Sequence, residues 1–321
     1  MPDYESGGRG FESLRARFFL STTIACTVVL ASLVGGGRAL AQELTPRSYS
    51  ASPIGVNFLV AGYTISEGSV LTDPSLPVTN VEASLDRSIL GYAHTFGLGK
   101  STANIQVVLP YNAASFSGDI MEQSASINKW GYGDLLVRLG WNLIGNPALK
   151  PAQFARRKPS TTFGASLTVL APTGAYNPSR LINTGSNRWA FLPEVGFEKP
   201  IKRWFLDGSA GAWLYTSNYN FLNGHVRSQN PVVDVQALYG YEWRPGLYVS
   251  AGAVYYGGGQ TSVDDVPNHN VLINGRYGLD FNAPISRAFS AHLKWSTWLT
   301  ATSGGEFHSL GFQLQYRWFD R

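Results

Sequence analysis

A serine beside a histidine is the arrangement in this chain that comes closest to covalent chemistry. The stretch EFHS, Glu306 to Ser309, places His308 next to Ser309. A hydroxyl becomes a nucleophile when a base lies within hydrogen-bonding reach. The stretch falls in a predicted strand, however, and adjacent strand residues point to opposite faces. We therefore expect no hydrogen bond between His308 and Ser309, which weighs against a lipid hydrolase.

Signals for metal or phosphate binding are weaker still. Asp264 and Asp265 lie in a polar loop that lacks calcium-loop spacing. The GGGQ stretch at 257–260 has no following helix or lysine, so it is a loop and not a phosphate cradle. The histidines are scattered and lack the close spacing of zinc ligands: His94, His225, His269, His292 and His308. We expect no metal site, no cofactor and no enzymatic activity.

Alternating polar and apolar residues predict an all-β fold without a convincing helix. The composition agrees, with 35 Gly, 17 Phe, 16 Tyr and 9 Trp but only 14% charged residues. The 25 basic and 21 acidic residues are too balanced for a nucleic-acid binder. About twelve strands are expected, at 54–66, 81–96, 101–112, 131–145, 161–172, 189–199, 204–216, 231–243, 247–257, 269–283, 288–300 and 307–319.

The connections between these strands alternate in length. Those after even strands are mostly tight, such as GLGK at 97–100 and RPG at 244–246, whereas those after odd strands are mostly long. Short turns at one end and long loops at the other are typical of an outer-membrane β-barrel with both termini in the periplasm. The basic connection 146–160 is long where a short turn is expected.

The stretch VLINGRYGLDFNAP, Val271 to Pro284, raises the question of which face meets water. A soluble sheet buries its apolar face, whereas a membrane barrel turns that face toward lipid. Aromatic residues at the ends of the apolar stripes favour the barrel, because aromatic girdles lie at membrane interfaces. The expected girdle residues are Trp189, Trp204, Trp243, Tyr255, Trp295 and Trp318. We predict that the apolar side of 271–284 faces lipid.

The N-terminus indicates export. Arg15 and Arg17 precede an apolar run, and Ala39 to Ala41 fits a cleavage site before Gln42, as in a secretory signal peptide. A single anchoring helix is the alternative. The expected organisation is a signal peptide at 1–41, a short periplasmic segment at 42–53 and an outer-membrane β-barrel domain at 54–321. Removal of the signal would also remove Cys26 and leave no cysteine.

A barrel of this size implies a narrow, partly occluded lumen. The alternation places eight charged residues on its inner face: Asp134, Arg138, Glu194, Asp234, Arg276, Asp280, Lys294 and Arg317. The mixed signs argue against strong ion selectivity. These side chains either meet a substrate or pair across the lumen as salt bridges, and the sequence leaves both possibilities open.

Three stretches resemble an outer-membrane family, the MetA-pathway of phenol degradation: GYGDLLV at 131–137, LAPTGAY at 170–176 and NTGSNRWAFLPEVGFEKP at 183–200. The resemblance covers most of 54–319. Its motif residues here are Gly133, Asp134, Pro172, Gly174, Tyr176, Asn183, Gly185, Asn187 and Trp189. The resemblance implies a barrel associated with uptake of aromatic or other hydrophobic compounds. The last strand also resembles the C-terminal signal that the barrel-assembly machinery recognises, although FDR follows its final tryptophan.

These observations predict a monomeric barrel in the outer membrane of a Gram-negative bacterium. Its expected function is a channel for small, hydrophobic or aromatic compounds. Its expected partners are outer-membrane lipid, such a substrate and the barrel-assembly machinery, and not nucleic acid. A structural or adhesin-like barrel without transport is one alternative, and an outer-membrane lipid hydrolase is another.

Overall fold

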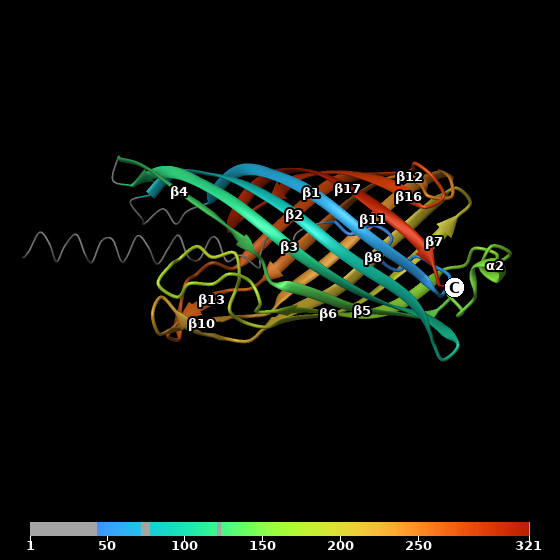
Figure 1. Ribbon diagram of the computed structural model, residues 1–321. Helices are drawn as coiled ribbons and strands as arrows, with labels where there is room; N and C mark the ends of the chain where they lie inside the picture. Colours follow the sequence, from blue (N-terminus) through green and yellow to red (C-terminus); the bar gives the residue numbers. More distant parts are fainter. Residues whose placement is uncertain (1–43, 72–77, 121–122, 321) are drawn as a thin grey trace, which may run out of the picture.

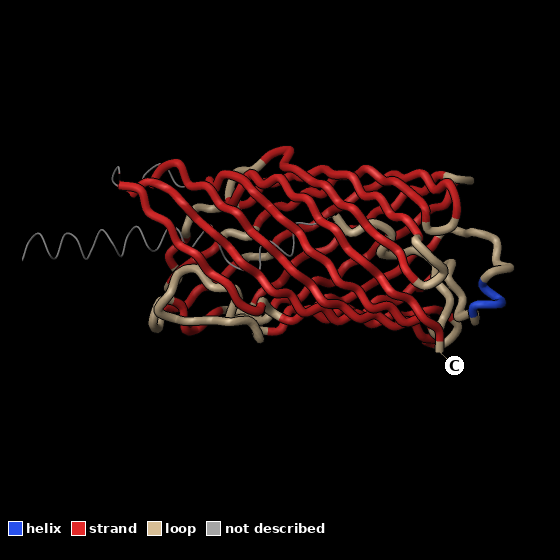
Figure 2. Tube along the Cα trace, turned by 45° about the horizontal axis from the view of Figure 1, so that its top comes forward, coloured by secondary structure: helices blue, strands red, loops and turns tan. Residues whose placement is uncertain are grey.

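A closed antiparallel β-barrel forms the body of the molecule (Figures 1 and 2). The computed structural model describes residues 44–71, 78–120 and 123–320, so the expected signal peptide at 1–41 lies outside the described residues. The barrel strands are β1 (Val56–Leu71), β2 (Val78–Leu98), β3 (Ser101–Ile120), β4 (Gln123–Tyr132), β5 (Leu135–Ile144), β6 (Thr162–Ala171), β7 (Ala190–Ile201), β8 (Trp204–Tyr215), β11 (Val232–Arg244), β12 (Leu247–Gly258), β15 (Leu272–Pro284), β16 (Phe289–Thr300) and β17 (Gly304–Phe319).

The barrel has 12 strand positions because β4 and β5 share one of them. Both strands pair with β3. The pairing with β4 runs from Tyr111↔Tyr132 to Ile120↔Gln123, and the pairing with β5 involves residues 103–108 of β3. The sheet closes where β1 pairs with β17 along its whole length. The expected number of strands is therefore confirmed. The strands near the N-terminus are longer than expected, because 67–71 and much of 113–130 continue the ladder instead of forming loops.

The apolar face of the sheet points outward. In β15, Ile273 and Leu279 are 51% and 50% exposed, whereas the residues that follow them, Asn274 and Asp280, are 4% and 3% exposed. A soluble sandwich would show the opposite pattern. The exposed apolar surface is therefore the lipid-facing wall of a membrane barrel, as predicted for 271–284.

The two ends of the barrel differ. Short turns lie at the end that also holds the C-terminus and the helix α2 (Pro151–Phe154) (Figure 1). At the other end the short strands β9 (Asn218–Phe221), β10 (His225–Gln229), β13 (Thr261–Val263) and β14 (Val266–Pro267) form a small separate sheet. Following the usual asymmetry of such barrels, we call the turn end the periplasmic end and the loop end the extracellular end. No helix in the described part of the chain is long and apolar enough to cross a membrane.

Candidate functional site in the barrel lumen

The N-terminal residues 44–50 lie inside the barrel, and we call them the lumen segment. Tyr49 is 1% exposed and Leu44 packs within a buried apolar cluster of inward side chains. Two glycines of the wall leave space for Tyr49. A Cβ added at Gly164 would lie 2.7 Å from a ring atom of Tyr49, and one added at Gly196 would lie 2.2 Å from another. Residues 44–50 of the segment predicted at 42–53 therefore lie within the barrel, where inward carboxylates and glycines provide a docking surface for them.

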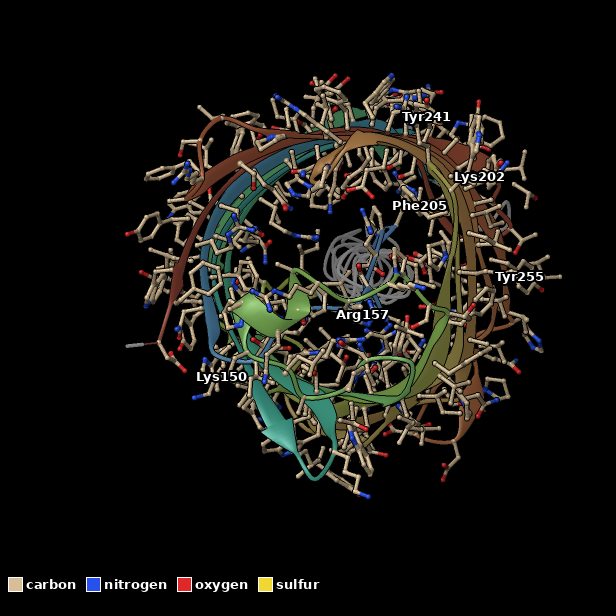
Figure 3. All side chains as sticks on the ribbon, turned by 90° about the vertical axis from the view of Figure 1, so that its right-hand side faces the viewer. Lys150, Arg157, Lys202, Phe205, Tyr241 and Tyr255 are labelled. Carbon is tan, nitrogen blue, oxygen red and sulfur yellow. The ribbon has the colours of Figure 1, made fainter. Side chains whose placement is uncertain are left out.

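Arg47 fixes the lumen segment to acidic side chains of the wall. Its guanidinium donates to Glu198 at 3.1 and 3.2 Å and to Glu242 at 3.1 Å, and it lies 4.7 Å from the ring centroid of Phe205. Its backbone N–H donates to Asp207. Burial lowers the pKa of Arg47, but the two glutamates raise it by more, so its pKa lies above the ordinary value. Figure 3 shows Phe205 pointing into the lumen.

Tyr49 makes a second set of polar contacts deeper in the wall. Its hydroxyl donates to Glu194 at 2.7 Å and lies 3.0 Å from the hydroxyl of Ser166. The guanidinium of Arg138 lies 5.2 Å from the centroid of its ring and 3.7 Å from Glu194. Burial and then the charge of Glu194 raise the pKa of the Tyr49 phenol. Two predicted lumen residues, Arg138 and Glu194, therefore meet each other and the lumen segment.

We expect Gly196→Ala to weaken the docking of Tyr49. The new methyl group would overlap the ring, and overpacking of this kind costs about 1–3 kcal/mol. Urea unfolding in detergent measures the loss. The same change in a Tyr49→Ala background should cost less, because the overlapping ring is then absent. Equal losses in both backgrounds would contradict the contact.

Apolar side chains occupy many inward positions of the extracellular half of the barrel, and we call them the apolar belt. Inward positions of a water-filled barrel are usually polar. Here neighbouring strands contribute a contiguous buried cluster: Leu170, Ala190, Leu192, Trp213, Val232, Leu238, Val254, Tyr256 and Leu272, with Leu44 of the lumen segment. A contiguous apolar cluster therefore lies above the charged contacts of Arg47 and Tyr49, beside inward polar residues such as Asn274 and Arg276.

The loop 172–189 narrows the extracellular mouth, and Asp134 holds it there. Asp134 is 3% exposed and accepts hydrogen bonds from the backbone N–H groups of Gly174 and Ser186, both at 2.9 Å. Gly174 and Gly185 are so close that a Cβ on either would lie 2.6 Å from the backbone of the other. The loop also places Ile182 in a second buried apolar cluster with Val70, Val81 and Phe116.

The remaining family-like residues shape the same loop. Tyr176 donates to the backbone carbonyl of Asn220 in β9 at 3.0 Å, and Asn183 bonds to the backbone of the turn 177–180. Asn187 adopts a left-handed conformation with φ 52°. Trp189 is 45% exposed at the extracellular end. Gly133 directly precedes Asp134. Pro172 directly follows the last residue of β6.

Four of the other predicted lumen residues face inward within strands, and the fifth, Arg317, lies at the periplasmic end. Asp234, Arg276, Asp280 and Lys294 occupy inward positions of β11, β15 and β16. Arg276 donates to two serine hydroxyls at 2.9 and 2.8 Å, and Asp280 lies opposite Lys294 in the strand register. Arg317 is exposed near the periplasmic end, where it donates to a turn carbonyl at 2.6 Å. The sequence reasoning missed Arg47, Tyr49 and the acidic partners of Arg47, because nothing in their spacing marks a segment that folds inward.

The basic connection 146–160 lies at the periplasmic mouth. The backbone N–H of Ile54, just before β1, donates to the carbonyl of Leu149 at 3.0 Å. Arg157 donates to the carbonyl of Gly145 and, at 2.6 Å, to the hydroxyl of Ser160. Seen along the barrel axis, α2 and Arg157 lie across part of the opening (Figure 3). This connection therefore narrows the exit next to the lumen segment.

Ser309 and His308 lie on opposite faces of β17, as predicted. The Ser309 hydroxyl contacts Ser66 at 2.8 Å and Arg276 inside the barrel. His308 contacts the hydroxyl of Thr297 at 2.7 Å on the outer side. The described residues include no group of three or more histidine, cysteine or acidic side chains placed to hold a metal ion.

An apolar outer wall and a lumen narrowed from both ends define a membrane-spanning β-barrel of the outer-membrane type. The chain belongs to the family described as the putative MetA-pathway of phenol degradation, whose model matches residues 63–316. This match confirms the resemblance seen in the motifs. No curated protein matches the sequence.

The comparison with solved structures found several similar chains. An outer membrane channel from Pseudomonas putida F1 has a TM-score of 0.73 and 22% identity, over 86% of this chain and 100% of that chain. The beta domain of the Bordetella autotransporter BrkA has a TM-score of 0.49 and 10% identity, over 83% of this chain and 100% of its own. The transport unit of the autotransporter AIDA-I from Escherichia coli has a TM-score of 0.48 and 11% identity, over 88% and 96%.

Proposed function

We propose that this protein is a channel through which small hydrophobic or aromatic compounds enter across the outer membrane. The apolar belt is the observation that carries this proposal. An inward leucine such as Leu192 or Leu238 makes no contact with lipid, yet it offers an apolar contact that favours the transfer of an apolar solute out of water. The family description, phenol degradation, supports aromatic compounds as the substrate class. The neighbour from Pseudomonas putida F1 is itself described as an outer membrane channel.

Passage in this proposal requires the lumen segment to move. Arg47 and Tyr49 are held by polar contacts at the wall, and Leu44 packs on the apolar belt. Breaking these contacts does not disrupt the hydrogen bonds between the barrel strands. The lumen segment therefore acts as a displaceable barrier between the apolar belt and the periplasm, and the inward charges near it form its docking site instead of selecting ions.

A polar substitution in the apolar belt tests the proposal. We expect Leu192→Asn to reduce uptake of a labelled aromatic compound, such as phenol or toluene, in a deletion strain. An apolar solute that passes the new amide must remove its bound water without replacing the hydrogen bonds, at a cost of about 1–3 kcal/mol, which corresponds to roughly tenfold in rate or occupancy. Leu192→Met, which nearly conserves volume, should retain uptake.

Equal uptake by cells with and without the protein, for every hydrophobic compound tried, would contradict a channel and favour a structural or adhesin-like barrel. A lipid hydrolase would instead lose activity in Ser309→Ala. The separation of His308 and Ser309 onto opposite faces speaks against that alternative. Export by a signal peptide at 1–41, assembly by the barrel-assembly machinery and a monomeric state are further parts of the proposal.

A further inference from the structure

An aromatic groove runs along the lipid-facing wall near the periplasmic end, with a volume of about 640 Å³. One side is a rigid aromatic cluster. The Trp204 ring stacks on Tyr239 at 4.9 Å and meets the edge of Tyr241 at 4.7 Å, while Trp243 meets Tyr241 at 5.2 Å. The small side chain of Ala251 forms part of the floor. The hollow is therefore bounded by rings that hold one another in place.

Basic side chains cluster at the periplasmic end of this groove. Lys202 and Arg203 lie in the turn between β7 and β8, and Arg244 ends β11; all three are exposed. Arg203 donates to the Tyr241 hydroxyl at 3.4 Å, which directs its guanidinium toward the aromatic cluster. Glu242, the acidic residue of this stretch, points inward to Arg47, and within the described part of the chain no carboxylate forms an ion pair with these three cations. Figure 3 shows Lys202 and Tyr241 on the outside of the barrel.

We propose that this groove is a binding site for an anionic phospholipid of the inner leaflet. The phosphate would lie against Arg203 and Arg244, and an acyl chain would lie along Trp204 and over Ala251. Clusters of basic residues beside a membrane segment attract anionic headgroups, and aromatic rings at this level form the interfacial girdle of such barrels. This site is on the outer face and is independent of the proposed transport through the lumen.

Charge favours a lipid over a second copy of the barrel as the occupant. Two copies joined through this face by a twofold axis would bring Lys202, Arg203 and Arg244 of each near those of the other. Like charges placed opposite one another oppose association. An anionic phospholipid instead supplies both the negative group at the basic end and the apolar chain along the rings.

Quenching of tryptophan fluorescence by brominated lipids tests the site. The full-length barrel is placed in nanodiscs of neutral phosphatidylcholine that contain a small fraction of either dibromo-phosphatidylglycerol or dibromo-phosphatidylcholine. The signal of Trp204 is obtained by comparison with Trp204→Phe. We expect the anionic lipid to quench Trp204 with an apparent affinity at least about fivefold above that of the neutral lipid. The preference should weaken in high salt.

The double variant Arg203→Gln/Arg244→Gln should lose this preference. The matched control Lys100→Gln/Arg287→Gln removes the same charge from other turns at the same end and should retain it. Heat-modifiable migration on gels verifies that each variant is folded. Equal quenching by both lipids in the wild type, or equal losses in the two double variants, would overturn the proposal. A dimer in light scattering that dissociates in Trp204→Ala would assign the groove to a second copy and would overturn it as well.

Discussion

Replacing Arg47 with alanine should open the channel. The change leaves Glu198 and Glu242 without their cation, and removing one partner of a buried ion pair costs about 3–5 kcal/mol. Arg47 is 21% exposed at its side chain, so we expect a loss of about 3 kcal/mol in the docking of the lumen segment. That loss shifts the ratio of docked to released segment by roughly a hundredfold. Single-channel recordings in planar bilayers should show a larger conductance with longer open periods.

Arg287→Ala is the matched control for this experiment. Arg287 lies in a periplasmic turn, and its backbone carbonyl accepts a hydrogen bond from Arg317 that survives the change. Its conductance should equal that of the wild type. If Arg47→Ala yields a folded barrel with wild-type conductance, the lumen segment is not the barrier to ions, and passage is limited by the loop 172–189 instead.

The barrel itself could be predicted from the sequence because its pattern is local. Every second residue of a strand faces the same side, so Leu135, Val137 and Leu139 could be assigned to one face without knowledge of their neighbours. The same reasoning placed Arg138 and Glu194 inside. This reasoning could not show that a guanidinium nitrogen of Arg138 lies 3.7 Å from a carboxylate oxygen of Glu194, because that contact depends on the register between β5, β6 and β7.

The lumen segment could not be predicted for a different reason. Its docking depends on pairs far apart in the chain, such as Arg47 with Glu242 and Tyr49 with Gly196. A short polar stretch without periodicity contains no signal for such contacts. The inward glycines are the sequence feature related to the lumen segment, since an inward position without a side chain leaves space that another segment fills.

Burial also changes what an inward position tolerates. From the alternation alone, Asn274→Arg is expected to be tolerated and to alter conductance, because Asn274 faces the lumen. In the structure Asn274 is 4% exposed, donates to the carbonyl of Ser303 at 2.7 Å and accepts from the N–H of Thr302 at 3.0 Å. These contacts argue that Asn274→Arg would instead reduce the stability of the barrel. Asn274 secures the turn between β16 and β17, and a larger cation there would break both bonds.

Leu279→Arg should destabilise the barrel strongly. Leu279 is 50% exposed on the outer wall and is paired in register with Ala251 and Trp295, away from both ends of its strand. An arginine on the lipid face near the bilayer midplane costs about 2–4 kcal/mol. Reversible urea unfolding in phospholipid vesicles, followed by tryptophan fluorescence, should show a loss of this size in the free energy of unfolding.

The inward variant Gln315→Arg separates the lipid contact from a general effect of an added cation. Gln315 alternates with the outward residues Leu314 and Tyr316 and pairs with Val60, so its side chain faces the lumen. Arginine at that position keeps access to polar partners and should change stability by less than about 1 kcal/mol. Equal losses at positions 279 and 315 would mean that the two faces do not differ in environment, and the assignment of the outer wall to lipid would then be wrong.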